Sequence, residues 1–310
     1  MAAKPVVVAG SVNMDLVINV DRMPRPGETV LGGRLQYIPG GKGLNQAIAA
    51  RRLGDGPVTL IGKVGEDAFG DTLLEFLHSQ DLGLGGVTRA PAPTGIALIT
   101  VDATAENAIV VVPGANFTLR PEDIDAMKGA VSKAGVVVAQ LEIPVPAVRR
   151  LFSMAREEGA TTILNAAPAA EVPLKLLTLV DYLCVNETEL AAMARLGRAP
   201  QELDDIVAAA RGLRSRGAGC VIVTLGARGS VTLADGQVIV IEGRKVAAID
   251  PTGAGDCFVG GLAARLSAGT HLREALGFAN YAAALSVERV GASSSIPHRS
   301  EVLGGFEEKE

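Results

Sequence analysis

The chain has 310 residues, of which 48% are apolar and 20% charged, so it can bury a sizeable core and is too apolar for a disordered polymer. Its net charge of −5, without a basic stretch interleaved with aromatic residues, argues against nucleic acid as a partner. The sequence has no uncharged apolar run of about 18 residues, the length of a membrane span, and no signal-peptide core at its start. We therefore expect a cytoplasmic protein that contacts no membrane.

The spacing of cysteines and histidines excludes the common metal and disulfide frameworks. We expect the cysteines to be small buried side chains and the histidines to lie at the surface. The residues concerned are Cys184, Cys220 and Cys257, and His78, His271 and His298.

Short apolar, β-branched runs recur along the chain and predict strands buried on both faces of a parallel sheet. In chain order they span 6–8, 58–61, 136–138, 161–164, 182–185 and 221–224. Helical patterns span 44–53, 69–79, 145–158, 187–196, 203–216, 255–268 and 272–287. This alternation predicts an α/β fold with a doubly wound, mainly parallel central sheet flanked by helices.

Two segments, about 12–40 and 94–112, break the alternation because they contain strand-like pieces without a helix between them. Within the second segment, 94–101 and 107–112 flank a polar turn and indicate a hairpin. We expect one domain over residues 1–310, with these two segments forming a small β-sheet that protrudes as a lid.

The stretch Asp250-Pro251-Thr252-Gly253-Ala254-Gly255-Asp256 follows a strand-like piece at 246–249 and opens an apolar helix. Its glycines allow a sharp turn, and the unpaired amides at a helix start form an anion site. The residues alone leave two roles open for Asp256, a cap of the helix or a general base beside a phosphate. The chain lacks both the P-loop pattern and a dinucleotide-binding pattern after the first strand.

This stretch resembles the C-terminal signature of the ribokinase-like (PfkB-type) carbohydrate kinases, and the resemblance extends over about 6–297. It implies that Asp256 takes the proton of the sugar hydroxyl that attacks the γ-phosphate of ATP. It also implies that the amides of Gly253, Ala254 and Gly255 form the anion hole. Mg²⁺ would accompany ATP, and K⁺ or a similar monovalent cation would activate the enzyme.

The form Gly40-Gly41-Lys42-Gly43-Leu44-Asn45 further implies D-ribose as the substrate, phosphorylated on its 5-hydroxyl. Sister kinases that use deoxyribose, another pentose, fructose or a nucleoside remain an alternative. A non-catalytic sugar-binding protein on the same fold is a second one.

The sugar end has a plain interpretation as well, because glycines, Asn13 and Asp15 are ordinary turn formers. The resemblance implies instead that they contact the sugar, that Glu142 does so at the end of a strand, and that Ala97 and Ile109 form an apolar wall from the lid. The implied sugar contacts are Asn13, Asp15, Gly41, Lys42, Asn45, Ala97, Ile109, Glu142 and Asp256.

At the nucleotide end, Asn186 and Glu189 have the spacing of a capping box. The resemblance adds magnesium and phosphate binding at this pair, with Glu189 associated with Mg²⁺. The implied nucleotide contacts are Asn186, Thr224, Gly226, Gly229, Gly255 and Asn280.

The resemblance also implies a monovalent cation site, formed largely by backbone carbonyls near the anion hole. Its residues would be Asp250, Thr252, Ser286, Arg289, Gly291 and Ser295. A homodimer formed through the small sheets is the last implication.

Overall fold

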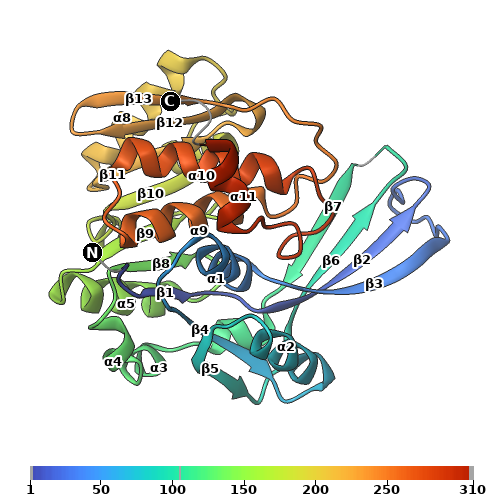
Figure 1. Cartoon of the computed structure of the whole chain (residues 1–310). Coiled ribbons are helices and arrows are strands. Elements are labelled where there is room, and N and C mark those ends of the chain that lie inside the picture. Colours follow the sequence, from blue (N-terminus) through green and yellow to red (C-terminus); the bar gives the residue numbers. More distant parts are fainter. Residues whose placement is uncertain (1–2, 105, 307–310) are drawn as a thin grey trace.

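The computed structural model describes residues 3–104 and 106–306, which form a nine-stranded central sheet and a separate four-stranded sheet (Figure 1). The order of the central sheet is β13-β12-β11-β10-β9-β8-β1-β4-β5. The pairs from β11 through β5 are parallel, and β12 and β13 add antiparallel strands at one edge. The strands are β1 (Val6–Ala9), β4 (Val58–Gly65), β5 (Gly83–Ala90), β8 (Val136–Gln140), β9 (Thr161–Asn165), β10 (Tyr182–Asn186), β11 (Cys220–Thr224), β12 (Gly229–Ala234) and β13 (Gln237–Glu242).

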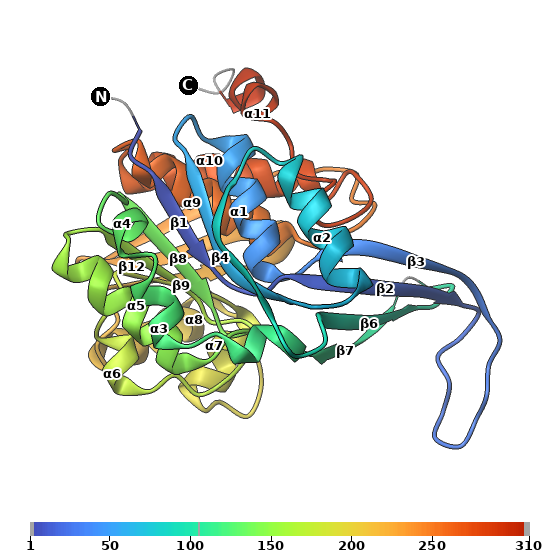
Figure 2. The same cartoon turned by 90° about the horizontal axis from the view of Figure 1, so that it is seen from below.

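Helices cover both faces of the central sheet (Figure 2). One layer holds α3 (Pro121–Asp125), α4 (Lys128–Val131), α5 (Val145–Glu157), α6 (Leu174–Leu177), α7 (Glu187–Ala194) and α8 (Leu203–Ser215). The other holds α1 (Lys42–Leu53), α2 (Ala68–His78), α9 (Ala254–Ser267), α10 (Leu272–Ser286) and α11 (Arg299–Phe306).

Strand β1 shows why its sequence does not alternate between apolar and polar. Val7 packs into the core on the α5 side, whereas Val6 and Val8 pack into the core on the α1 and α9 side. Successive side chains of a strand point to opposite faces, so a strand between two helical layers needs apolar residues throughout. The predicted doubly wound, mainly parallel sheet is confirmed.

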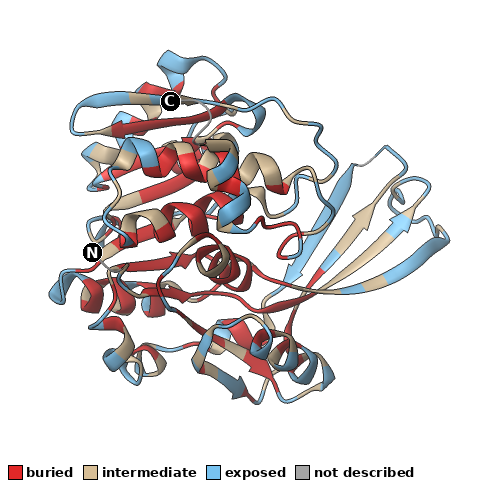
Figure 3. Cartoon of the chain, in the orientation of Figure 1, coloured by how far each residue is buried: buried red, intermediate tan, exposed pale blue. Residues whose placement is uncertain are grey.

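The second sheet has the order β3-β2-β6-β7 and stands away from the central sheet (Figure 1). Its strands are β2 (Asn13–Val20), β3 (Gly32–Gly40), β6 (Gly95–Val101) and β7 (Asn107–Val112). Figure 3 shows it as mostly exposed or intermediate, in contrast to the buried inner strands of the central sheet. Every residue of β7 is exposed, including Ile109, Val110 and Val111.

Two sequence-based expectations are wrong in detail. Residues 246–249 do not form a strand; the Ile249 and Asp250 amides instead donate to the carbonyl of Val287 at 2.7 and 3.1 Å. Asn13 and Asp15 lie at the start of strand β2, so their interpretation as turn residues is wrong. β5 was not anticipated, because its sequence, Gly83–Ala90, is rich in glycine and has several exposed positions.

The expectations for cysteines and histidines are confirmed, since the three thiols are free and buried and the three imidazoles are exposed. Among the described helices, none combines the length and apolar character needed to cross a membrane.

Candidate active site

Asp256 stands at the start of α9, where the backbone turns sharply at Gly253. Gly253 has φ 76°, and a Cβ there would lie 2.9 Å from the Cα of Ala292, so only glycine fits this turn. Asp256 is 8% exposed. Its Oδ1 accepts from Gln46 Nε2 at 2.8 Å and its Oδ2 from Asn45 Nδ2 at 3.1 Å. The carboxylate is therefore held by side chains of α1 and does not cap α9.

Four carboxylates and one lysine share this buried region. Burial raises the pKa of Asp15 to about 7, and the nearby charges of Glu142 and Asp256 add to the rise while Lys42 opposes it. Burial also raises the pKa of Asp256, against the lowering effects of Lys42 and of the Gln46 and Asn45 amides. Burial and the excess of carboxylates over cations therefore both oppose ionisation of Asp15 and Asp256.

Lys42 is the cation of this cluster. Burial lowers the pKa of its ammonium, but the carboxylates of Asp256, Glu142, Glu189 and Asp15 outweigh burial, so its pKa lies above the ordinary value. The lysine is therefore charged, and it faces both the sugar residues and the nucleotide residues.

The polar side chains of the predicted sugar end are fixed by neighbours that the motifs do not include. Asn116 Nδ2 donates to Asn13 Oδ1 at 2.7 Å, and the Ser11 hydroxyl donates to Glu142 Oε2 at 2.5 Å. Gly41 has φ 94°, and a Cβ there would lie 2.8 Å from the Ser11 carbonyl oxygen. The chain at Gly41 thus passes closely over Ser11 and begins α1 beside Glu142.

Strand β2 places Asn13 and Asp15 on one face, because their separation is two residues. In strand β6, Ala97 pairs with Asp15 and is buried. Ile109 belongs to the next strand, β7, where it pairs with Ile99 of β6 and is 54% exposed. The structure therefore brings Ala97 beside the acidic cluster and leaves Ile109 at the outer strand of the second sheet.

The predicted nucleotide residues line two adjoining cavities. The first, about 210 Å³, is lined by polar and glycine residues together with a few apolar ones; the polar and glycine residues are Lys42, Asn165, Asn186, Glu189, Thr224, Gly253, Gly255 and Asp256. The second, about 670 Å³, shares Thr224 and Gly255 with it and contains Gly226, Gly229 and Asn280. Its remaining wall is largely apolar, with Val246, Phe258 and Val287.

Asn186 and Glu189 form the predicted capping box of α7. Asn186 Oδ1 accepts from the Glu189 amide, and Glu189 Oε2 accepts from the Asn186 amide, both at 2.8 Å. This arrangement occupies Oε2 and leaves Oε1 of Glu189 as a possible ligand atom on the wall of the smaller cavity.

The two segments of the predicted cation site meet at Asp250. Its oxygens accept from the Thr252 amide at 2.9 Å and the Gly291 amide at 2.8 Å. Burial alone would raise the pKa of Asp250, but these hydrogen bonds lower it below the ordinary value. The Arg289 side chain forms an ion pair with Glu301, so Arg289 could contribute to the predicted cation site only through its backbone. Ser286 and Ser295 donate to Ala283 and Ala292 carbonyls.

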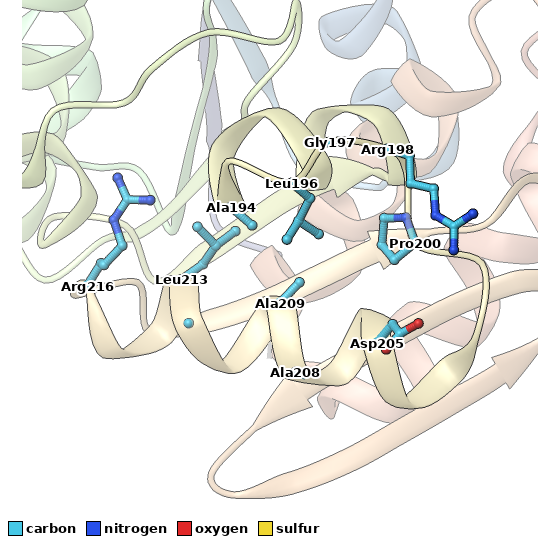
Figure 4. A pocket seen from close by; sticks show the side chains of 11 residues that line it. Ala194, Leu196, Gly197, Arg198, Pro200, Asp205, Ala208, Ala209, Leu213 and Arg216 are labelled. Carbon is cyan, nitrogen blue, oxygen red and sulfur yellow. The ribbon is translucent and has the colours of Figure 1, made fainter.

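Another hollow, about 630 Å³, lies between α7 and α8 and contains none of these residues (Figure 4). Small side chains such as Ala194 and Ala209 line it, and Arg198 and Arg216 stand at its opposite ends. The described residues that line it include no cluster of buried acids, which distinguishes it from the cavities at Asp256.

The motifs missed three side-chain amides at the site, those of Gln46 and Gln140, which are buried, and that of Asn165, which is half-buried. A usable signal was present, because Gln46 and its neighbour Asn45 interrupt a helical stretch at 43–50 that otherwise contains only glycine and apolar residues. The motifs also missed Ser11 and Asn116, which carry no spacing signal.

The cavities around Asp256 lie at the carboxyl ends of the parallel strands, which is where open α/β sheets bind their ligands. Residues 3–299 match the pfkB family carbohydrate kinase, and the chain belongs to this family.

Among curated relatives, the ribokinase of Staphylococcus aureus is 40% identical over 96% of this chain and 98% of its own length. A bifunctional ribokinase/ribose-5-phosphate isomerase A of Fructilactobacillus sanfranciscensis is also 40% identical, and the chain spans 56% of its length. A deoxyribokinase of Salmonella typhi is 34% identical over 94% of this chain and 95% of its own. The structure of Arabidopsis thaliana ribokinase complexed with ribose and ATP has a TM-score of 0.88 at 32% identity, covering 99% of both chains.

Proposed function

We propose that the chain transfers the γ-phosphoryl group of ATP to the 5-hydroxyl of D-ribose, with Asp256 as the general base. The observation that carries this proposal is the place of Asp256, which borders the polar cluster of Asp15 and Glu142 and also lines the smaller nucleotide-side cavity. A hydroxyl bound by the first set would meet a phosphate bound in the second.

The base and the anion hole come from the same turn. Gly253, Ala254 and Gly255 present the first amides of α9, where the helix dipole favours developing negative charge. A Cβ at Gly255 would meet no atom within 4 Å, so this glycine borders open space that a phosphate can enter. Charged Lys42 would stabilise the phosphoryl group between donor and acceptor.

On the sugar side, Asp15, Asn45 and Glu142 supply acceptors and donors suited to vicinal hydroxyls, and Asn13 and the Gly41 backbone would add to them. Ala97 gives an apolar surface beside them. On the nucleotide side, Asn186, Thr224, Gly226, Gly229 and Asn280 would hold phosphates and base.

The residues present suit a magnesium ion bound with the nucleotide. Magnesium is held by one or two carboxylates together with substrate phosphates and water, and Glu189 offers one oxygen on the wall of the smaller cavity. When bound, the ion neutralises phosphate charge. The Asp250 loop suits a monovalent cation, because its hydrogen bonds join Thr252 and Gly291 and bring their carbonyl-bearing backbone together.

The four-stranded sheet would serve as a lid and as a homodimer interface. It exposes several large apolar side chains, among them Leu35, Leu98, Val110 and Val112. Exposed apolar side chains that gather on one face are typical of a surface that binds another protein. Sedimentation of the free protein tests the dimer, and protection of 96–112 from hydrogen exchange by ribose tests the lid.

A coupled ADP assay with a panel of sugars tests the substrate. We expect ribose to give the highest kcat/KM, with deoxyribose, other pentoses, fructose and nucleosides below it. A nucleoside or hexose turned over faster than ribose would replace ribose in the proposal. If none of the sugars in the panel led to ADP formation, the non-catalytic alternative would be favoured.

A further inference from the structure

Gln46 connects Asp256 to two further side-chain amides, those of Gln140 and Asn165. It lies in the second turn of α1 and is fully buried. Its Nε2 donates to Asp256 Oδ1 at 2.8 Å and to Asn165 Oδ1 at 3.0 Å. Its Oε1 accepts from Gln140 Nε2 at 2.6 Å. One side chain thus joins α9, β9 and β8.

The neighbours of Gln46 fix which way its amide points. Asn165 Nδ2 donates to the Cys184 carbonyl at 3.3 Å, a group that can only accept, so Asn165 presents its Oδ1 to Gln46. The ionised carboxylate of Asp256 also only accepts. Both neighbours therefore require Nε2 of Gln46, and Oε1 is left for Gln140.

Close backbone packing holds Gln46 in place. A Cβ at Gly260 of α9 would lie 2.7 Å from the Gln46 carbonyl oxygen and 2.8 Å from the Ala50 nitrogen. Glycine at this position lets α9 lie directly against α1. On the other side, a Cβ at Gly10 would collide with Oε1 of Gln140.

The two oxygens of Asp256 consequently differ. Oδ1 is bound to a fully buried amide, whereas Oδ2 accepts from Asn45, which belongs to the proposed sugar contacts. We propose that Gln46 is a positioning residue that holds Oδ1, so that Oδ2 takes the proton of the sugar hydroxyl. This inference rests on the proposed function.

The atoms of the step balance with ATP and the sugar alone. The hydroxyl O–H bond breaks and its proton passes to Oδ2 of Asp256. The hydroxyl oxygen forms a bond to the γ-phosphorus. The bond from the γ-phosphorus to the bridging oxygen breaks, and that oxygen leaves with ADP.

The charges around Asp256 give the role a second readout. The groups that face it are Lys42 of α1, Asp15 of β2, Glu142 after β8, Glu189 of α7 and Cys257 of α9. Burial raises the pKa of Asp256, and the Gln46 hydrogen bond is among the contacts that lower it. Loss of that bond raises the pKa further, and because the base must be ionised, the acid limb of turnover moves to higher pH.

Gln46→Met tests the inference, since methionine keeps the length of the side chain and removes both donors. We expect kcat to fall by on the order of 10²-fold, as a misplaced reacting group does, with the acid limb of its pH profile shifted upward. The KM values for ATP and sugar should stay near those of the unmodified enzyme. Ile48→Val, which removes one methyl from the same helix without touching an amide, should leave kcat and the pH profile unchanged.

A kcat within twofold of the unmodified enzyme and an unshifted acid limb would overturn the inference. If Gln46→Met does not fold, Gln140→Met decides, because it frees Gln46 Oε1 and should shift the limb in the same direction by less. An unshifted limb there also overturns it. Asp256→Asn distinguishes this inference from the proposed function. Normal turnover in Asp256→Asn would refute Asp256 as the base. Lost turnover in Asp256→Asn together with an unaffected Gln46→Met would refute only the positioning role of Gln46.

Discussion

Around Asp256 the sugar side is lined by buried side chains that ionise, whereas the larger nucleotide-side cavity is lined mainly by glycines and apolar groups, with Arg244 and Lys245 as its exposed charged residues. Asp15, Lys42 and Glu142 form the first. Gly226, Gly229 and Val246 are typical of the second, which is also the larger space at about 670 Å³. A polyol needs many directed hydrogen bonds, but a phosphate chain can be held by backbone amides and a base by apolar contact. Loss of a single side chain should therefore weaken substrate binding more on the sugar side than on the nucleotide side.

The largest effect should occur at the boundary of the two sides. Asp256→Asn keeps the shape and the acceptor Oδ1 but removes the base, so kcat should fall by roughly 10²- to 10⁴-fold. Calorimetry should still detect binding of ATP and ribose. Asp204→Asn, an exposed acid in the first turn of α8, is the matched control. Unchanged turnover in Asp256→Asn would show that the reaction does not take place between the two sides at Asp256.

The backbone of the nucleotide side is tested at Gly253. Gly253→Ala places a Cβ 2.9 Å from the Cα of Ala292 at φ 76°, so the amides at the start of α9 must move. We expect kcat to fall by roughly 10²- to 10³-fold, the cost of a lost oxyanion donor. Gly269→Ala carries the same kind of strain, with φ 80° and no neighbour within 4 Å, and should destabilise folding without affecting kcat. Equal effects of the two on kcat would contradict the anion hole.

The pH dependence of the sugar side follows from Asp15, whose pKa is about 7. Ionised Asp15 accepts hydrogen bonds from sugar hydroxyls, so sugar binding should strengthen as pH rises through 7. The KM for ribose should fall by roughly tenfold between pH 6 and 8, while the KM for ATP changes less. In Asp15→Asn the KM for ribose should be higher and independent of pH over this range.

The same shift has a consequence for the unliganded fold. Because the folded pKa of Asp15 lies above its unfolded value of 3.8, the folded state holds more protons between these values. The Asp15 contribution to the free energy of unfolding therefore decreases as pH rises from about 4 to 7 and is constant above. Thermal unfolding of Asp15→Asn should lack this component, and an identical pH trend in both proteins would contradict the shift.

The smallest effect should follow loss of a side chain on the nucleotide side. Asn280 is one of the few polar side chains there, and its Nδ2 already donates to Ser230 Oγ at 3.1 Å. Asn280→Ala should raise the KM for ATP by roughly two- to tenfold, the value of one ordinary hydrogen bond, and leave the KM for ribose unchanged. A rise of several orders of magnitude in the KM for ATP would show that side chains, and not the backbone, hold the nucleotide.

Much of the central fold could be predicted from the sequence, because strands buried on both faces, such as 6–8 and 136–138, need unbroken apolar runs. The 246–249 run carries the same kind of residues but is exposed at most positions and bonds to the end of α10. Local composition cannot distinguish it from a strand, because only its distant partner, Val287, decides its conformation.

Candidate site residues could be predicted where a short motif contains several of them, as at 250–256 and 40–45. It could not be predicted where the contact joins distant segments. Gln46 and Gln140 are separated by 94 positions, and Asn13 and Asn116 by 103. These pairings exist only after the strands have assembled, so no local spacing contains them.

The reaction product tests the central claim most directly. The protein is incubated with ATP, Mg²⁺, K⁺ and ribose, and the mixture is followed by ³¹P NMR with ¹³C-labelled sugar. The account predicts one ribose 5-phosphate for each ADP, with the phosphorus coupled to C5. Release of inorganic phosphate without a sugar ester, or an ester at another carbon, would contradict it.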